Sequence, residues 1–123
     1  MEVKPVQPNI TFGYTNKLKT LYLKGKIKPK YGLYGDKLTK KTVTLEHILC
    51  RSKGGKTEIE NLALASARMN NARGNKPLSE YLTPEGLAYY CDYFMHVKLL
   101  EFDGVKYIKA LLKTINNVLD KGL

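Results

Sequence analysis

Cysteine is scarce in this chain of 123 residues, with Cys50 and Cys91 as the only two. They form no C-x-x-C pair and no disulfide framework, so we expect reduced thiols, with Cys91 buried in a helix. No run of about 18 apolar residues is present, which argues against a transmembrane helix and a membrane partner. The first residues carry no apolar signal region. These absences predict a single small domain in the reducing cytoplasm of a bacterial cell or a phage-infected host.

Positive charge is abundant, and it is unevenly distributed. The formal net charge is +10. Residues 1–45 hold ten lysines against two acids, residues 46–76 hold six basic residues against three acids, and residues 77–123 hold five against six. The excess therefore lies in the first two thirds of the chain. Such a basic region is typical of a nucleic-acid binder, with a merely solubilising lysine-rich surface as the alternative.

The densest pattern of chemically active residues lies in the middle of the chain. His47 is followed by Asn61 after 14 residues and by Asn70 after 23, on either side of a Gly-Gly pair at 54–55. A histidine with a pKa near neutrality can take a proton from water. The carboxylate of Glu46, together with an amide oxygen from another element, can hold a hard cation such as Mg²⁺. Phosphodiester hydrolysis needs both an activated water and a cation on the phosphate.

This order and spacing resemble the HNH (ββα-metal, His-Me finger) endonucleases. Their general form is acid-His-Ile-x-Pro-x-Ser-x-Gly-Gly, then Asn-Leu, then Asn-x-x-Lys/Arg-Gly. The matching stretches are residues 46–55, 61–62 and 70–74, and the resemblance extends from about Lys30 to Leu82. It implies an α+β fold in one domain, with an HNH core over 30–82. A basic N-terminal arm and short helix (1–29) precede this core, and two amphipathic helices (83–123) follow it.

The resemblance also implies roles for four residues. His47 is the general base, and Asn61 is the central asparagine that braces the loop and the backbone of the histidine. Glu46 and Asn70 are the ligands of Mg²⁺ or Mn²⁺. Each residue alone has an ordinary structural interpretation, such as a packed histidine or a solvent-facing asparagine. Their joint register with the glycines favours the catalytic one.

The chain departs from the family pattern at two motif positions. Glu46 stands where aspartate is usual, and the extra methylene alters the geometry that Mg²⁺ demands. Cys50 stands where proline is common, which we expect to affect loop rigidity more than chemistry. Many HNH domains also hold a structural zinc ion on two C-x-x-C pairs. The aligned positions here carry no cysteine, so we expect no structural zinc: they are Tyr31, Tyr34, Ser66 and Met69.

Basic side chains in and around the motif are candidates for contacts with DNA phosphates. On the expected helix, only Arg73 shares the face of Asn70 with certainty. Solvated surface charge is the alternative for each residue taken singly. The predicted DNA-binding set is Arg51, Lys53, Lys56, Arg68, Arg73 and Lys76.

Local patterns predict the secondary structure. In the first half we expect an irregular arm over Met1 to Gly13, a helix over Asn16 to Leu23 capped by Thr15, and a hairpin of Tyr31–Leu38 with Lys41–Glu46. A strand over Asn61–Ala65 and a helix from the cap Ser66 to Gly74 follow.

The C-terminal third is predicted to be helical. Leu78 to Leu82 has the pattern of a short helical turn, and Thr83-Pro84-Glu85 that of a helix start. A second amphipathic run covers Val105 to Leu119 after a break at Asp103-Gly104. Its apolar stripe is interpreted as core, with a homodimer or protein-partner surface as the alternative. His96 is interpreted as a surface or packed residue.

Two functional hypotheses follow from these patterns. The first is a metal-dependent HNH endonuclease that hydrolyses DNA, with its basic half on the phosphate backbone. The second is a catalytically weak HNH fold that binds nucleic acid or a protein, for example as a phage-encoded antagonist of a host nuclease. Glu46, the missing zinc ligands and the additional helices motivate the second hypothesis.

Overall fold

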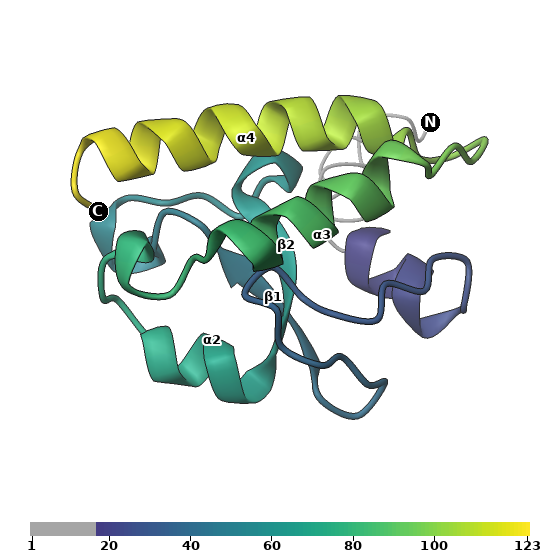
Figure 1. Ribbon diagram of the computed structural model, residues 1–123, viewed down its shortest axis with the longest axis horizontal. Coiled ribbons are helices and arrows are strands. Elements are labelled where there is room, and N and C mark those ends of the chain that lie inside the picture. Colours follow the sequence, from purple (N-terminus) through teal and green to yellow (C-terminus); the bar gives the residue numbers. More distant parts are fainter. Residues whose placement is uncertain (1–16) are drawn as a thin grey trace, which may run out of the picture.

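The computed structural model describes residues 17–123 as an α+β fold, which confirms the coarse class predicted from the sequence (Figure 1). The expected arm over Met1 to Gly13 and the expected cap Thr15 lie outside the described residues. Residues 17–23 are helical, with Leu18 and Leu21 buried, as the predicted first helix requires. The further elements are β1 (Val43–His47), η1 (Arg51–Lys53), η2 (Ile59–Asn61), β2 (Leu62–Ser66), α2 (Ala67–Arg73), η3 (Leu78–Glu80), α3 (Pro84–Met95) and α4 (Gly104–Asp120).

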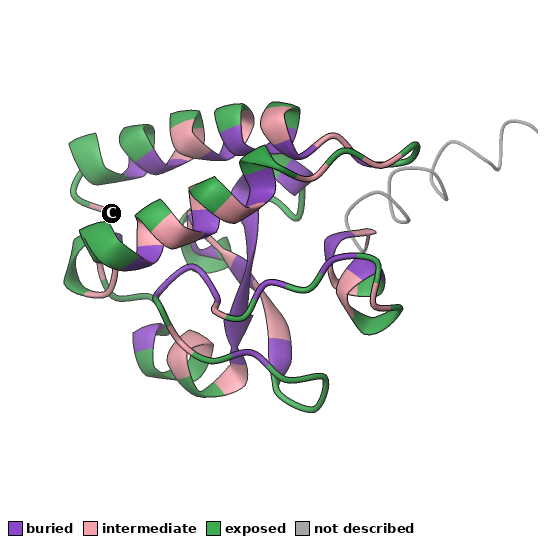
Figure 2. Ribbon diagram, turned by 45° about the vertical axis from the view of Figure 1, so that its right-hand side comes forward, coloured by how far each residue is buried: buried purple, intermediate pink, exposed green. Residues whose placement is uncertain are grey.

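The two strands form an antiparallel pair at the centre of the molecule. The register pairs Val43 with Ser66 and His47 with Leu62. All five residues of β2 are buried (Figure 2), which explains its nearly continuous apolar sequence. Figure 1 shows α2 on one side of this pair, with α3 and α4 on the other. The strand pair therefore lies between α2, which carries the last part of the motif, and the helices of the C-terminal third.

The predicted hairpin between residues 31–38 and 41–46 is wrong. β1 pairs with β2 instead, and residues 31–38 fold into a turn closed by a single bridge between Tyr31 and Lys37. The amide of Gly32 donates to the carbonyl of Asp36, and Gly35 has a φ of 80°. This left-handed conformation, which glycine adopts without strain, reverses the chain before a strand can form.

The last two helices both begin at a side-chain cap, of which the sequence predicted the first, at Thr83. The Thr83 hydroxyl accepts a hydrogen bond from the Gly86 amide at 3.0 Å, at the beginning of α3. The Asp103 carboxylate does the same for the Lys106 amide at 3.2 Å, at the beginning of α4. A Cβ on Gly104 would lie 1.9 Å from the Phe94 carbonyl oxygen, so only glycine lets α4 start this close to α3.

The apolar stripe of α4 packs into the core, which confirms the core interpretation. Four of its residues are buried, whereas Leu119 remains 37% exposed. Cys91, on α3, is only partly buried. Among the described residues, no helix combines the length and the apolar character needed to cross a membrane. The buried members of the stripe are Ile108, Leu111, Ile115 and Val118.

Candidate active site

The end of β1 and the helix α2 bring three of the motif side chains to one small cavity. Glu46, His47 and Asn70 all line it, and its volume is about 240 Å³. The strand supplies the first two residues and the helix supplies the third, because the antiparallel pair of β1 and β2 leads directly into α2. The other lining residues are Cys50, Arg51, Ser52, Gly74 and Asn75.

Asn61 fastens the loop rather than facing this cavity. Its side-chain oxygen accepts from the Leu49 amide at 2.8 Å, and its nitrogen donates to the carbonyls of Leu49 and Lys56. The loop between them is tight, because a Cβ on Gly55 would lie 1.7 Å from the Leu49 carbonyl oxygen. These contacts are those of a loop brace. That Asn61 belongs to the catalytic set stays a prediction.

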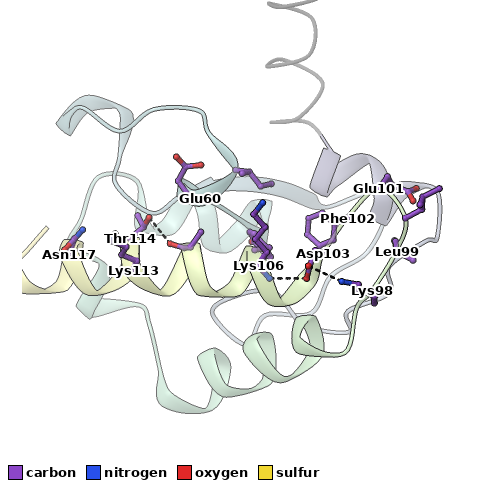
Figure 3. Close-up of a pocket in the computed structure, with 14 residues that line it drawn as sticks. Glu60, Lys98, Leu99, Glu101, Phe102, Asp103, Lys106, Lys113, Thr114 and Asn117 are labelled. Atoms are coloured by element: carbon purple, nitrogen blue, oxygen red, sulfur yellow. Dashed lines mark hydrogen bonds and ion pairs between the residues drawn. The ribbon is translucent and has the colours of Figure 1, made fainter.

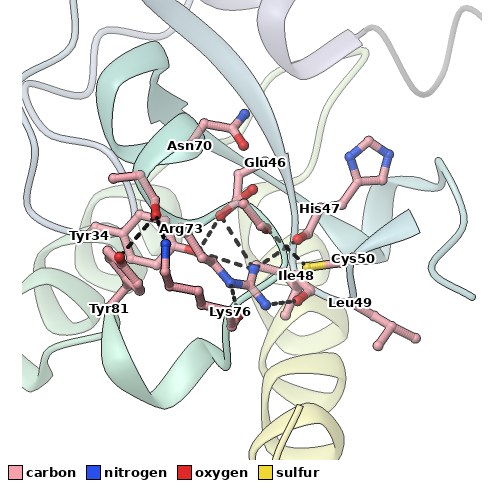
Figure 4. A network of polar contacts seen from close by, with 12 residues as sticks. Tyr34, Glu46, His47, Ile48, Leu49, Cys50, Asn70, Arg73, Lys76 and Tyr81 are labelled. Carbon is pink, nitrogen blue, oxygen red and sulfur yellow. Dashed lines mark hydrogen bonds and ion pairs between the residues drawn. The ribbon is translucent and has the colours of Figure 1, made fainter. Parts of the chain in front are cut away.

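The carboxylate of Glu46 is buried and already bonded on one side. Its Oε2 accepts a hydrogen bond from the Tyr34 hydroxyl and lies 3.3 Å from Nη1 of Arg73 (Figure 4). Burial raises the pKa of Glu46, opposed by the Tyr34 hydrogen bond and the Arg73 charge. Burial and the Glu46 charge likewise raise the pKa of Tyr34. Tyr34 therefore remains a neutral donor at neutral pH.

His47 lies at the edge of this cluster. Figure 4 shows its ring projecting away from Tyr34, Glu46 and Arg73, as expected for neighbouring residues on a strand. One ring nitrogen, Nε2, lies 2.9 Å from the Thr57 hydroxyl. Partial burial, and then the positive charge of Arg51, lower the pKa of His47 below its ordinary value. The imidazole is therefore neutral at pH 7 and can accept a proton.

The amide of Asn70 is held in a defined orientation. Its nitrogen donates to the Thr44 hydroxyl at 3.0 Å and to the Leu45 carbonyl at 3.1 Å. Both partners lie on β1. This leaves the side-chain oxygen as the group that can face a cation, the role the resemblance gives it.

The oxygen donors at the cavity fit Mg²⁺ or Mn²⁺ in kind. One carboxylate oxygen of Glu46 and the amide oxygen of Asn70 are hard ligands, and Mg²⁺ commonly takes only one or two protein ligands and completes its shell with water and phosphate. The Arg73 guanidinium opposes a cation by charge. Within residues 17–123, no three His, Cys, Asp or Glu side chains gather as a metal cluster, so any such site rests on these two ligands.

Comparisons of the chain with protein-family models, with curated proteins and with solved structures gave no match. The HNH resemblance therefore rests on the motif and carries only a proposal.

Five residues of the predicted DNA-binding set lie at the surface, and the sixth does not. Arg73 is wrong as a DNA contact, because its side chain is 0% exposed. Arg73 shares the helix face of Asn70, as predicted. That face of α2 packs inward against β1. Its guanidinium is bonded inside the protein and cannot reach a phosphate. The exposed members are Arg51, Lys53, Lys56, Arg68 and Lys76.

Two polar contacts at the site were not predicted from the sequence. Tyr34 was named only as a position that lacks a zinc-binding cysteine, yet its hydroxyl bonds Glu46. Thr57 was not among the predicted site residues, yet its hydroxyl lies against the ring of His47. Neither has a local signal, because both contacts join residues ten or more positions apart. Thr57 could be recognised as a partner of His47 only if the conformation of the loop between them were known.

A larger cavity, of about 1100 Å³, lies elsewhere, between the 98–103 turn, η2 and α4 (Figure 3). It contains no histidine and none of the predicted site residues. Several of its charges neutralise one another, as in the pair of Lys98 and Asp103 at 3.3 Å. The small cavity is therefore the better candidate, although it is less roomy.

Proposed function

We propose that this protein hydrolyses phosphodiester bonds of DNA as a metal-dependent endonuclease of the HNH (ββα-metal) type. The observation that carries the proposal is the single cavity lined by Glu46, His47 and Asn70. The strand–strand–helix order of β1, β2 and α2 supports the same core.

His47 acts as the general base in this proposal. With the Thr57 hydroxyl accepting from Nε2–H, the lone pair lies on Nδ1, which takes the proton of the attacking water. The lowered pKa of His47 keeps this lone pair free at neutral pH. Thr57 thus fixes the orientation of the ring.

Glu46 and Asn70 would hold the cation. When bound, Mg²⁺ or Mn²⁺ supplies positive charge to the phosphate and to the leaving 3′ oxygen. The chain's own contribution is to fix the two ligands: Tyr34 holds the Glu46 carboxylate, and Thr44 with Leu45 holds the Asn70 amide.

DNA binding relies on charge around the cavity. Arg51 lines the cavity itself, and Lys53 follows it on the exposed turn η1. Arg68 lies exposed on α2. Contacts of this kind bind the backbone without reading bases, and their strength falls as salt is added. We therefore propose low sequence specificity.

Plasmid relaxation tests the proposal. The intact protein should convert supercoiled plasmid in Mg²⁺ or Mn²⁺ and leave it untouched in EDTA. His47→Ala should abolish the conversion. The chain has one other histidine, His96, which is exposed after α3 and away from the cavity, so His96→Ala is the matched control and should cleave normally. If the intact protein leaves plasmid unchanged in both metals, the enzymatic proposal fails.

One observation favours the second hypothesis, a catalytically weak HNH fold that binds nucleic acid or a protein. Oε2 of Glu46 is already bonded to Tyr34 and Arg73, so the carboxylate has a structural role without any cation. Titration with Mn²⁺, followed by electron paramagnetic resonance, separates the two. The endonuclease should bind one ion, with an affinity that falls by about tenfold or more in Asn70→Ala, whereas a pure binder should bind none.

A further inference from the structure

From a fully buried position at the end of α2, Arg73 contacts the end of β1 and the turn that follows α2. Its Nη1 donates to the His47 carbonyl at 3.0 Å, and its Nη2 donates to the Ile48 carbonyl at 2.8 Å. Its Nε donates to the Lys76 carbonyl at 3.0 Å. The same Nη1 lies 3.3 Å from Oε2 of Glu46. The guanidinium therefore holds two carbonyls just where β1 ends and the motif loop begins.

Asn61 holds the same backbone by different groups. The Ile48 amide donates to the Asn61 carbonyl at 2.9 Å, and the Leu49 amide donates to the Asn61 side chain. The carbonyls of His47 and Ile48 thus face Arg73, while the Ile48 amide and both backbone groups of Leu49 face Asn61. The backbone that carries His47 is fixed on both sides.

The chemistry of this contact requires arginine. A guanidinium presents five N–H donors in a fixed plane, so it can bind several acceptors at once. A lysine ammonium is a point charge on a flexible stem and cannot span the carbonyls of His47, Ile48 and Lys76 together with Glu46. The charge alone is therefore not the function of this side chain.

Arg73 also links the part of the site on β1, which carries His47, to the part on α2, which carries Asn70. Asn70 lies three residues before Arg73 on the same short helix, and its amide is bonded to Thr44 and Leu45 on β1. Two residues on the same face of α2 are thereby bonded to β1. The spacing between His47 on the strand and Asn70 on the helix is set by these bonds.

We propose that Arg73 is a positioning residue of the active site, with Tyr34 as its auxiliary. It fixes the strand end that carries His47 and the carboxylate of Glu46, and it contacts neither DNA nor the reacting atoms. Tyr34 contributes by donating to Glu46 and by accepting from Nη1 of Arg73 at 3.4 Å. This inference rests on the proposed endonuclease function.

The first test separates kcat from KM. Arg73→Lys keeps the charge and loses the fork. Because misplacement by about 1 Å can cost 10²-fold in rate, we expect kcat to fall by about 10²-fold with KM and the salt dependence of DNA binding unchanged. Tyr34→Phe should lower kcat by a smaller factor. Tyr89→Phe is the matched control: it also removes one hydroxyl, which accepts from the Lys30 amide, and should leave kcat unchanged.

The second readout does not depend on activity. Hydrogen exchange at the amides of Ile48 and Leu49, measured by NMR, should become about tenfold faster in Arg73→Lys, while exchange within α4 stays as in the wild type. The same local loosening, at smaller amplitude, is expected in Tyr34→Phe. Tyr89→Phe should not change it.

Each opposing result overturns the inference. A raised KM with a shallower salt dependence would make Arg73 a phosphate contact, and wild-type kcat with wild-type exchange would remove any positioning role.

If Arg73→Lys loses its circular dichroism signal, Tyr34→Phe decides, and a wild-type kcat in that variant overturns the inference. If the wild-type protein itself cleaves no DNA, the proposed function fails separately, and exchange at Ile48 and Leu49 still decides whether Arg73 holds this backbone.

Discussion

At the scale of single residues, Glu46 has to satisfy two demands at once. Its carboxylate balances the buried charge of Arg73, and in the proposed mechanism it also binds a cation. Removing one partner of a buried pair leaves the other charge uncompensated. Asn70 carries no such double role in charge, because its amide is neutral. It is therefore the cleaner residue with which to test the cation site.

Asn70→Ala is expected to lower the affinity for Mn²⁺ by about tenfold or more, since it removes one of two protein ligands. DNA affinity at fixed salt should be retained, because the exposed basic side chains supply most of it. Electron paramagnetic resonance measures the first quantity and fluorescence anisotropy the second. Asn71→Ala, the same substitution at the exposed neighbouring position, should change neither. Unaltered Mn²⁺ binding in Asn70→Ala would mean that the ion is bound elsewhere.

Thr57→Val should lower kcat by about tenfold without changing KM, because His47 loses the hydroxyl that orients its ring. Steady-state cleavage of a labelled duplex measures both constants. Thr57→Ser keeps a hydroxyl at this position and should restore most of the rate. Equal rates for the valine and serine variants would show that the hydroxyl has no part in catalysis.

At the scale of elements, α2 is short, and its position depends on its first residue. The Ser66 hydroxyl accepts from the Met69 amide at 3.2 Å and so caps the helix that carries Asn70 and Arg73. Ser66→Ala should lower the free energy of unfolding by about 1 kcal/mol, measured by urea denaturation. Ser79→Ala, at an exposed serine on η3, is the control and should cost much less. An equal loss in both variants would contradict the capping role.

Elements whose signals are local were predictable from the sequence. Ser66 and Thr83 cap their helices as expected, because a cap involves only residues within one turn. The partner of β1 was mispredicted, because strand pairing is a long-range choice that the turn at Gly35 decided. Arg73 shares the face of Asn70, as predicted, but the neighbouring residues in the sequence give no signal that this face is buried. The bond between Tyr34 and Glu46 depends on that same packing.

At the scale of the whole molecule, tyrosine hydroxyls connect the sheet to the C-terminal helices. The Tyr90 hydroxyl lies 2.8 Å from that of Tyr107 and accepts from the Leu64 amide. The Tyr107 hydroxyl donates to the Leu62 carbonyl at 2.7 Å. Both rings are buried, and burial raises the pKa of Tyr90 and of Tyr107. β2 is thus fastened to α3 and α4 by groups that must stay protonated.

Stability should therefore fall at alkaline pH. A pKa raised in the folded state stabilises the fold below the ordinary tyrosine pKa near 10, and this stabilisation is lost as pH rises further. Absorbance of phenolate should show a step, above the ordinary tyrosine pKa, that coincides with loss of the circular dichroism signal. Titration of every tyrosine in one step, with the fold intact, would contradict the role of the buried pair.

In the proposed mechanism, His47 performs the chemistry while other residues bind DNA. Single-turnover cleavage of a labelled duplex in Mg²⁺, with DNA affinity measured on the same samples, tests it most directly. His47→Ala should bind DNA as the wild type does and cleave it about 10²- to 10⁴-fold more slowly. Cleavage by His47→Ala at the wild-type rate, or loss of DNA binding in proportion to the loss of rate, would contradict the claim.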